Sequence, residues 1–128
     1  MIKDEDIEAI GGPTIGADPI VGAVGVLSYL KGRILQTFIV RKSPKGHGTK
    51  RQIEGPPLLR GSRAIIVDDV ATTGGSILES LEVLKKNGIK VKKAICIVDR
   101  QEGARVNLSK AGCSLVSIFK KKDFFQTK

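Results

Sequence analysis

The most informative stretch of the sequence reads Ile65-Ile66-Val67-Asp68-Asp69-Val70-Ala71-Thr72-Thr73-Gly74-Gly75-Ser76. The apolar residues at its start predict a buried strand over Ala64–Val67, and two adjacent carboxylates follow that strand directly. Small residues come next and lead into an amphipathic pattern over Ser76–Lys86, which predicts a helix. A strand, a turn of small residues and a helix in this order predict one unit of a parallel α/β sheet.

The turn in this stretch predicts a phosphate site. Successive backbone N–H groups from Ala71 to Ser76 can surround an anion, and the positive end of the helix dipole adds to the attraction. The two glycines allow close approach of the backbone, and the hydroxyl donors are Thr72, Thr73 and Ser76. The stretch lacks the Gly-Lys-Ser/Thr ending of a Walker A loop, and its two acids set it apart from the dinucleotide fingerprint.

The acid pair narrows the predicted ligand to a sugar phosphate. Asp68 and Asp69 would hold ribose hydroxyls or a magnesium shell, while the amides that follow hold the phosphate. The alternative interpretation is structural: either acid belongs to a loop, and Thr73 or Ser76 caps the helix.

Strand and helix patterns alternate along the rest of the chain. A short apolar piece at Ile7–Ile10 ends at Gly11-Gly12. Strands are predicted at Ile34–Val40, Ala94–Val98 and Leu115–Phe119, and helices are predicted at Pro19–Leu30 and Ala104–Ala111. This alternation predicts one α/β domain over residues 1–119, with a twisted, mostly parallel sheet and helices on both faces. The polar segment Arg41–Ser62 has no periodicity and is predicted to be a long functional loop, and residues 120–128 form a basic tail.

Composition limits the class of protein and its partners. The 128 residues suit a single domain, and 22 Lys and Arg against 13 Asp and Glu give a net charge of +9, which favours nucleic acid or a phosphorylated small molecule as partner. Aromatic residues make up only 4%, so the stacking platform of single-strand binders is missing and nucleic acid is the less favoured partner. No apolar run is as long as the about 20 residues that a membrane-spanning helix needs, and the N-terminus lacks the pattern of a signal peptide. We therefore expect a cytoplasmic protein without membrane association, with Cys96 and Cys113 as reduced core thiols.

The long loop begins with a group of cations in the stretch Arg41-Lys42-Ser43-Pro44-Lys45-Gly46-His47-Gly48. A loop that closes on pyrophosphate would need such a group, because the leaving group gains negative charge in the transition state. The alternatives are a solvated basic loop or a patch that binds nucleic acid.

Two shorter segments are further candidates. The stretch Gly11-Gly12-Pro13-Thr14-Ile15-Gly16-Ala17-Asp18-Pro19 is rich in turn-forming residues, and its alternative is an ordinary strand-to-helix connection. The stretch Val98-Asp99-Arg100-Gln101-Glu102-Gly103-Ala104 follows a predicted strand, at the edge where ligands of open α/β sheets bind. Arg100 either meets an anionic ligand there or forms a surface ion pair with Asp99 or Glu102.

These four segments resemble, in the same order, the motifs of the type I phosphoribosyltransferases, and in particular those of the orotate phosphoribosyltransferases. The resemblance extends over nearly the whole chain, from Ile7 to Phe119. It implies the reaction of orotate with phosphoribosyl pyrophosphate (PRPP), in the presence of magnesium, to give orotidine 5′-phosphate and pyrophosphate. That reaction belongs to pyrimidine nucleotide (UMP) biosynthesis.

The resemblance also implies residue roles. Asp68 and Asp69 would hold the ribose 2′ and 3′ hydroxyls, the 5′-phosphate would lie against Ala71, Thr72, Thr73, Gly74, Gly75 and Ser76, and orotate would meet Thr72 and Arg100. Pyrophosphate would be bound by the turn at Thr14, Ile15 and Gly16, where some members carry a lysine at the position of Gly16. It would also be bound by Arg41, Lys42, Lys45 and His47 of a homodimer partner, since the Arg41–Ser62 loop is shared between subunits. The catalytic set would be Lys45, His47, Asp68 and Asp69, with Mg²⁺ held mainly by PRPP or near the acid pair.

The sequence departs from this pattern at its front. Family members have a substantial segment before the first core strand that covers the base, whereas here Met1 is followed almost at once by that strand. The sequence therefore leads us to expect PRPP binding of ordinary strength, weak orotate binding and low turnover. Two alternatives remain at this point: a PRPP-binding regulatory protein, or a nucleic-acid-binding protein on the same fold with little transferase activity.

Overall fold

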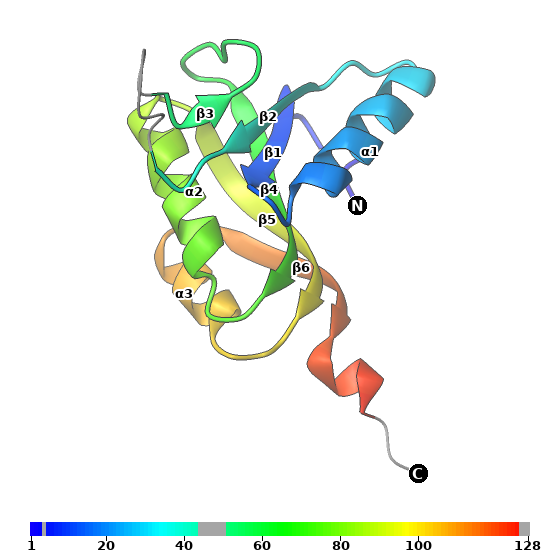
Figure 1. Ribbon diagram of the computed structural model, residues 1–128, viewed down its shortest axis with the longest axis vertical. Helices are drawn as coiled ribbons and strands as arrows, with labels where there is room; N and C mark the ends of the chain where they lie inside the picture. Colours follow the sequence, from blue (N-terminus) through cyan, green and yellow to red (C-terminus); the bar gives the residue numbers. More distant parts are fainter. Residues whose placement is uncertain (4, 44–50, 126–128) are drawn as a thin grey trace.

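The computed structural model describes residues 1–3, 5–43 and 51–125, which form a six-stranded sheet with helices on both faces (Figure 1). The strand order is β3-β2-β1-β4-β5-β6, and every neighbouring pair is parallel except β2 and β3. This confirms the predicted mostly parallel α/β sheet. The strands are β1 (Ala9–Pro13), β2 (Gln36–Val40), β3 (Ile53–Glu54), β4 (Arg63–Ala71), β5 (Lys90–Asp99) and β6 (Ser114–Lys120), and the helices are α1 (Asp18–Leu30), α2 (Gly75–Lys86), α3 (Ala104–Lys110) and the 3₁₀ helix η1 (Lys121–Phe124).

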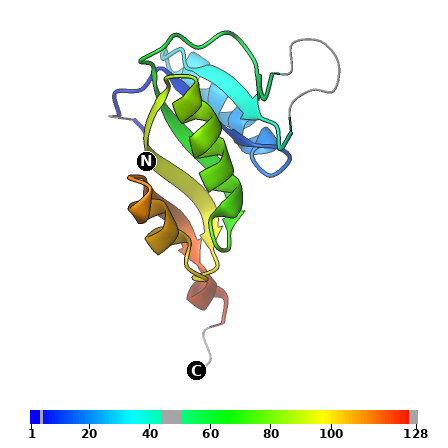
Figure 2. The same cartoon turned by 90° about the vertical axis from the view of Figure 1, so that its left-hand side faces the viewer.

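The sheet separates two apolar cores. Ile66 of β4 faces α2 and α3, where it packs in one cluster with Leu84 and Leu108. Its neighbour Ile65 faces the other side and packs with Val21 of α1. Figure 2 shows α2 in front of the sheet and α1 behind it. The alternation along β4 therefore holds the middle of the sheet between two helical layers.

Strand β4 is longer than the sequence pattern predicted. It continues past the predicted end at Val67 to Ala71, because β5 pairs with it as far as the Ala71–Asp99 register. Asp68 and Asp69 therefore lie on a strand and not in a loop. This excludes the loop-acid interpretation, since the backbone of both acids is fixed by the sheet.

Strand β1 also differs from its prediction. The sequence pattern predicted that the first apolar segment ends at Gly11-Gly12, but both glycines lie inside the strand. A Cβ atom on Gly11 would lie 2.2 Å from the Phe38 carbonyl oxygen, and one on Gly12 would lie 2.0 Å from the Val67 carbonyl oxygen. The two glycines thus allow β1 to lie tightly between its neighbours, and this close packing places the following turn beside the end of β4.

The Arg41–Ser62 segment contains one strand that the sequence did not predict. Ile53–Glu54 forms β3, which pairs antiparallel with the end of β2 through the Ile39–Glu54 and Val40–Ile53 registers. The pairing is too short to give a period-2 pattern, which explains why it was missed. It anchors the far end of the basic loop to the edge of the sheet.

The remaining expectations on the fold have mixed outcomes. Strands β5 and β6 are longer than predicted, and the three helices agree with their predicted bounds to within one residue at either end. Cys96 and Cys113 are free and buried, as expected, and burial raises the pKa of each thiol to about 11. In the described part of the chain, no helix is long and apolar enough to cross a membrane.

Candidate functional site

The acid pair lies directly against the turn that follows β1. Asp68 is buried, with 6% of its surface exposed, whereas Asp69 is exposed. A Cβ atom on Gly16 would lie 2.5 Å from Asp68 Oδ1 and 2.4 Å from Asp69 Oδ1. A side chain at position 16 would require the two carboxylates to shift, so Gly16 lets the turn lie directly against them, in addition to the backbone contact expected from the sequence.

The environment of Asp68 changes its titration. Burial raises the pKa of this carboxyl to about 7, and the neighbouring Asp69 carboxyl adds to the rise, while a hydrogen bond from the Asp69 backbone N–H at 2.8 Å opposes it. A buried carboxyl without a cationic partner reduces the stability of the fold when it ionises. Such groups are frequent where a protein needs the carboxylate for a ligand.

This raised pKa gives a prediction on stability. Because the pKa of Asp68 rises from 3.8 in the unfolded chain to about 7 in the folded chain, stability is lost as the pH rises through this window. Asp68→Asn removes the ionisation and should raise the free energy of unfolding at pH 8 by on the order of 2–4 kcal/mol, with little effect at pH 4. Urea denaturation at the two pH values measures this difference, with Glu82→Gln on the exposed side of α2 as control. A gain in stability over the unaltered chain that is no larger at pH 8 than at pH 4 would contradict the assignment.

The predicted phosphate loop connects β4 to an uncapped helix. Gly74 precedes α2 with a φ of 88°, in the left-handed region that favours glycine, and no side chain caps the helix. This excludes Thr73 and Ser76 as helix caps. The N–H groups at the start of α2 are therefore available to an anion, as the sequence analysis predicted.

The loop is held in place by α3. The Asn107 side-chain amide donates to the Thr73 carbonyl oxygen at 2.8 Å, and a Cβ atom on Gly74 would lie 3.3 Å from Ala104 Cα. Asn107 is not among the predicted site residues, because a single polar residue in a short helix carries no pattern. These contacts join α3 to the predicted phosphate loop.

The turn after β1 has its own polar contacts. The Thr14 hydroxyl donates to Asp18 Oδ2 at 3.0 Å, and the Thr14 N–H donates to the Val40 carbonyl oxygen at 3.1 Å. The Thr14–Ile15 peptide bond is cis, and Ile15 is 78% exposed. Through Gly16 this turn lies against the acid pair, and it also forms the connection from β1 to α1.

Arg100 lies beside the phosphate loop, at the end of β5. Its N–H donates to the Ala71 carbonyl oxygen at 2.9 Å, and its guanidinium lies 3.7 Å from the Glu102 carboxylate. The ion pair with Glu102 is the alternative that the sequence analysis named, and both partners are about half exposed, so the pair is weak. Asp99, in contrast, is buried and lies 3.5 Å from Arg105. The structure places Arg100 near Thr72 while leaving its guanidinium open to a stronger anion.

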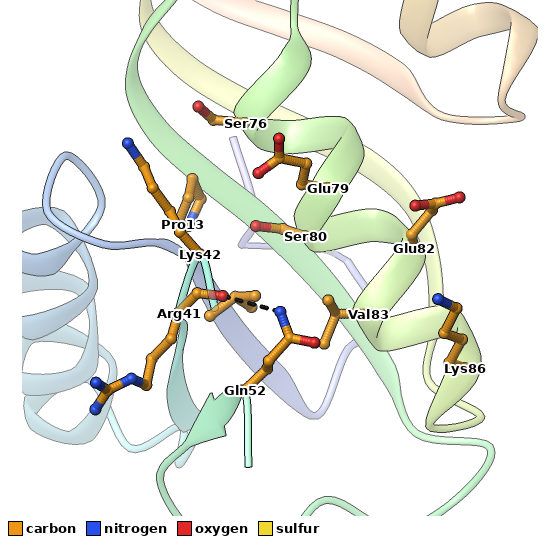
Figure 3. A pocket seen from close by; sticks show the side chains of 11 residues that line it. Pro13, Arg41, Lys42, Gln52, Ser76, Glu79, Ser80, Glu82, Val83 and Lys86 are labelled. Atoms are coloured by element: carbon orange, nitrogen blue, oxygen red, sulfur yellow. Dashed lines mark hydrogen bonds between the residues drawn. The ribbon is translucent and has the colours of Figure 1, made fainter. Parts of the chain in front are cut away.

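The start of the basic loop lies next to α2. The Arg41 N–H donates to the Gln52 carbonyl oxygen at 2.7 Å, the Gln52 amide donates back to the Arg41 carbonyl oxygen at 3.3 Å, and Arg41 lies 3.5 Å from Glu54. A hollow of about 220 Å³ lies between the start of this loop and α2. Lys42 and Ser76 both line it (Figure 3). The predicted cations Lys45 and His47 lie outside the described residues.

Comparison with known proteins identifies the family. The model of the phosphoribosyl transferase domain matches residues 20–121. Among relatives, the orotate phosphoribosyltransferase of Bradyrhizobium diazoefficiens is 41% identical over 128 residues, which cover 98% of this chain and 68% of the relative. The chain belongs to the orotate phosphoribosyltransferase family. The family member from Aquifex aeolicus is 43% identical over 120 residues, and the match covers 94% of this chain and 65% of that relative, so the chain spans about two thirds of the length of these relatives.

Solved structures of the family share this fold. The orotate phosphoribosyltransferase of Mycobacterium tuberculosis, in complex with Fe(III) dicitrate, has a TM-score of 0.84 at 34% identity, covering 98% of this chain and 69% of that one. The same enzyme in complex with PRPP has a TM-score of 0.80 at 32% identity, covering 95% of this chain and 68% of that one. The predicted fold and family are thereby confirmed. These relatives are all phosphoribosyltransferases and do not favour the regulatory or nucleic-acid-binding alternatives.

Proposed function

We propose that this protein is an orotate phosphoribosyltransferase that transfers the ribose 5-phosphate of PRPP to orotate, in pyrimidine nucleotide synthesis in the cytoplasm. The products are orotidine 5′-phosphate and pyrophosphate. The observation that carries the proposal is the packing of Asp68 and Asp69 against Gly16, beside an uncapped start of α2. This arrangement offers carboxylates to ribose hydroxyls and free N–H groups to a phosphate within one edge of the sheet.

The residues would act by position and charge. The acid pair fixes the ribose through its hydroxyls, and the N–H groups of Ala71–Ser76 hold the 5′-phosphate. The turn at Thr14–Gly16 and the cations Arg41, Lys42, Lys45 and His47 stabilise the charge that develops on the departing pyrophosphate. Arg100 holds the carboxylate of orotate through its two-pronged guanidinium, with the Thr72 hydroxyl beside it.

The carboxylates of the acid pair fit a magnesium ion that is bound mainly by the oxygens of the substrate. The part of the chain that the structure describes holds no cluster of three or more metal-ligating side chains, and the acid pair is the local source of carboxylates. Magnesium in phosphate sites is commonly bound by one or two carboxylates together with substrate oxygens. Asp68 and Asp69 would complete its shell, and the ion would supply positive charge to the pyrophosphate.

The function is tested by incubating the protein with orotate, PRPP and magnesium and following the loss of orotate absorbance. We expect the loss to require all three components. Omission of PRPP is the control. If calorimetry shows that the protein binds PRPP but the absorbance stays constant at saturating orotate, the assignment of PRPP binding is kept and transfer to orotate is refuted.

We also propose a homodimer in which each basic loop serves the partner's site. This gives a complementation prediction: mixing Lys45→Ala chains with Asp68→Asn/Asp69→Asn chains forms hybrid dimers with one complete site. In an equal random mixture about half of the dimers are hybrids, so activity should recover to about a quarter of the unaltered level. Steady-state turnover of the mixture and of each parent measures this.

The control mixture combines Lys45→Ala with His47→Ala, where both changes lie in the loop and no site becomes complete. Absence of recovery in the first mixture, with hybrids demonstrated by differently tagged chains, would show that each loop serves its own chain.

A further inference from the structure

The turn that leads from β5 to α3 is held by a buried carboxylate. Asp99, the last residue of β5, is 2% exposed, and its Oδ1 accepts the backbone N–H of Gln101 at 2.8 Å. Aspartate side chains hold tight turns in this way, by accepting the backbone N–H of the second residue after them. Arg100 lies between the two, so the carboxylate of Asp99 constrains the backbone that carries Arg100.

The backbone of Arg100 is also held from its other side. Its own N–H donates to the Ala71 carbonyl oxygen at 2.9 Å, at the end of β4. Figure 1 shows this turn beside the one that leads from β4 to α2. Because the N–H groups of Arg100 and Gln101 both donate to fixed acceptors, the Arg100 backbone has a set position relative to the predicted phosphate loop.

This turn has an unfavourable backbone. In the described part of the chain, Gln101 is the one residue other than glycine with a positive φ, of 60°. A left-handed backbone raises the free energy of a residue that has a side chain, and such residues are concentrated in functional sites. Burial of the Asp99 carboxylate adds a desolvation cost. Two costs at one turn indicate that its shape serves more than the connection of β5 to α3.

A second arginine balances the charge of Asp99. Arg105 Nε lies 3.5 Å from Asp99 Oδ2, so the carboxylate has one oxygen toward the turn and the other toward Arg105. Arg100 itself pairs only with the exposed Glu102, at 3.7 Å. Arg105 thus supplies the counter-charge of Asp99, and the Arg100 guanidinium stays available to a ligand.

We propose that Asp99 is a positioning residue for the recognition of the orotate carboxylate. It holds the turn so that the Arg100 guanidinium meets that carboxylate in the two-pronged geometry, and it touches neither substrate itself. The inference rests on the proposed function, because it takes the contact between Arg100 and orotate from there. It deepens that function by naming the residue on which the geometry of this contact depends.

The test compares two nucleotides that differ only in the carboxylate on the base. Orotidine 5′-phosphate carries this carboxylate and uridine 5′-phosphate lacks it, and without pyrophosphate no transfer consumes either. In isothermal titration calorimetry, Asp99→Ala should lower the affinity for orotidine 5′-phosphate about tenfold and leave the affinity for uridine 5′-phosphate unchanged. Asp99→Asn keeps an oxygen that can accept the Gln101 N–H, so it should retain most of the affinity for orotidine 5′-phosphate.

A double-mutant cycle shows whether Asp99 acts through Arg100. In an Arg100→Ala chain, the further change Asp99→Ala should alter the affinity for orotidine 5′-phosphate by less than about twofold, because the contact that Asp99 positions is already absent. Glu8→Ala is the matched control, since the Glu8 carboxylate also accepts a backbone N–H, that of Arg63 at 2.6 Å, but at the opposite end of β4. It should leave both nucleotide affinities unchanged.

A second substitution guards against a loss of the fold. Asp99→Leu keeps a branched side chain without the acceptor and should give the same result as Asp99→Ala, with circular dichroism as the check on folding. Unfolding of both variants would overturn the inference, because Asp99 would then be needed for the fold itself.

The two nucleotides also separate this inference from the proposed function. An unchanged affinity for orotidine 5′-phosphate in the folded variants, or an equal loss for both nucleotides, would overturn the inference and leave the proposed function standing. If orotidine 5′-phosphate binds the unaltered chain no more tightly than uridine 5′-phosphate, the proposed role of Arg100 is wrong and the inference falls with it.

Discussion

Replacing Asp68 and Asp69 together by Asn should reduce PRPP affinity by about a hundredfold or more and leave the fold intact. Each carboxylate would lose a charge-assisted hydrogen bond to a ribose hydroxyl, worth about 1.5–3 kcal/mol, and 1.4 kcal/mol corresponds to a factor of ten. The fold should be kept because the side-chain amide oxygen introduced by Asp68→Asn can still accept the 2.8 Å bond that the Asp69 backbone now donates to Asp68. Isothermal titration calorimetry with PRPP and magnesium measures the loss.

The control for the acid pair is Glu82→Gln, which removes a carboxylate from the exposed side of α2. It should bind PRPP as the unaltered chain does. Unchanged PRPP affinity in a folded Asp68→Asn/Asp69→Asn chain would remove the assignment of the site, and with it the role given to the Gly16 contact.

Replacing Arg100 by Ala should act on the other substrate. Orotate affinity should fall by about thirty- to a hundredfold, as expected for the loss of a paired guanidinium–carboxylate contact of about 2–3 kcal/mol, while PRPP affinity stays the same. The pairing with Glu102 at 3.7 Å is weak and exposed, so its loss should not change stability measurably. Orotate titration of the protein in the absence of PRPP, so that no transfer consumes the ligand, measures the effect.

Two controls make the Arg100 result specific. Arg100→Lys keeps the positive charge but loses the two parallel N–H donors of the guanidinium, so it should have only part of the orotate affinity of the unaltered chain. Lys110→Ala removes one positive charge from the exposed end of α3 and should change neither substrate's affinity. A parallel loss of PRPP affinity in Arg100→Ala would place this arginine at the phosphate loop instead of at the base.

The sequence was sufficient for the parts of the site that are local in the chain. The acid pair, the small residues after it and the helix beginning near Ser76 form one continuous stretch, and the structure keeps them together. The same holds for the parallel sheet, because its buried strands are separated by helices with clear apolar faces.

Other features depended on contacts between distant residues. Gly11 and Gly12 read as the end of a strand, yet they lie inside β1 because Phe38 and Val67 approach them from neighbouring strands. Strand β3 was missed because two residues carry no period, and its existence depends on the edge of β2. Asn107 reaches Thr73 across 34 positions of sequence, a distance over which no pattern in a single sequence gives a signal.

The apolar outer face of α1 illustrates a third kind of limit. The sequence predicted this helix correctly, but helical periodicity does not distinguish a face covered by the chain's own core from one covered by a second molecule. In the folded chain Tyr29 and Leu30 are exposed, so the chain's own core does not cover this face. The structure thus adds the exposure of these side chains to a helix whose position was already expected.

Phosphorus NMR of the protein with PRPP and magnesium, recorded with and without orotate, tests the central claim most directly. We predict that the PRPP signals persist without orotate, and that with orotate they are replaced by signals of pyrophosphate and orotidine 5′-phosphate in equal amounts. The Asp68→Asn/Asp69→Asn chain should leave PRPP unchanged in both samples. PRPP that stays intact in the presence of orotate, or that breaks down equally without it, would contradict the proposal that this site transfers ribose 5-phosphate to orotate.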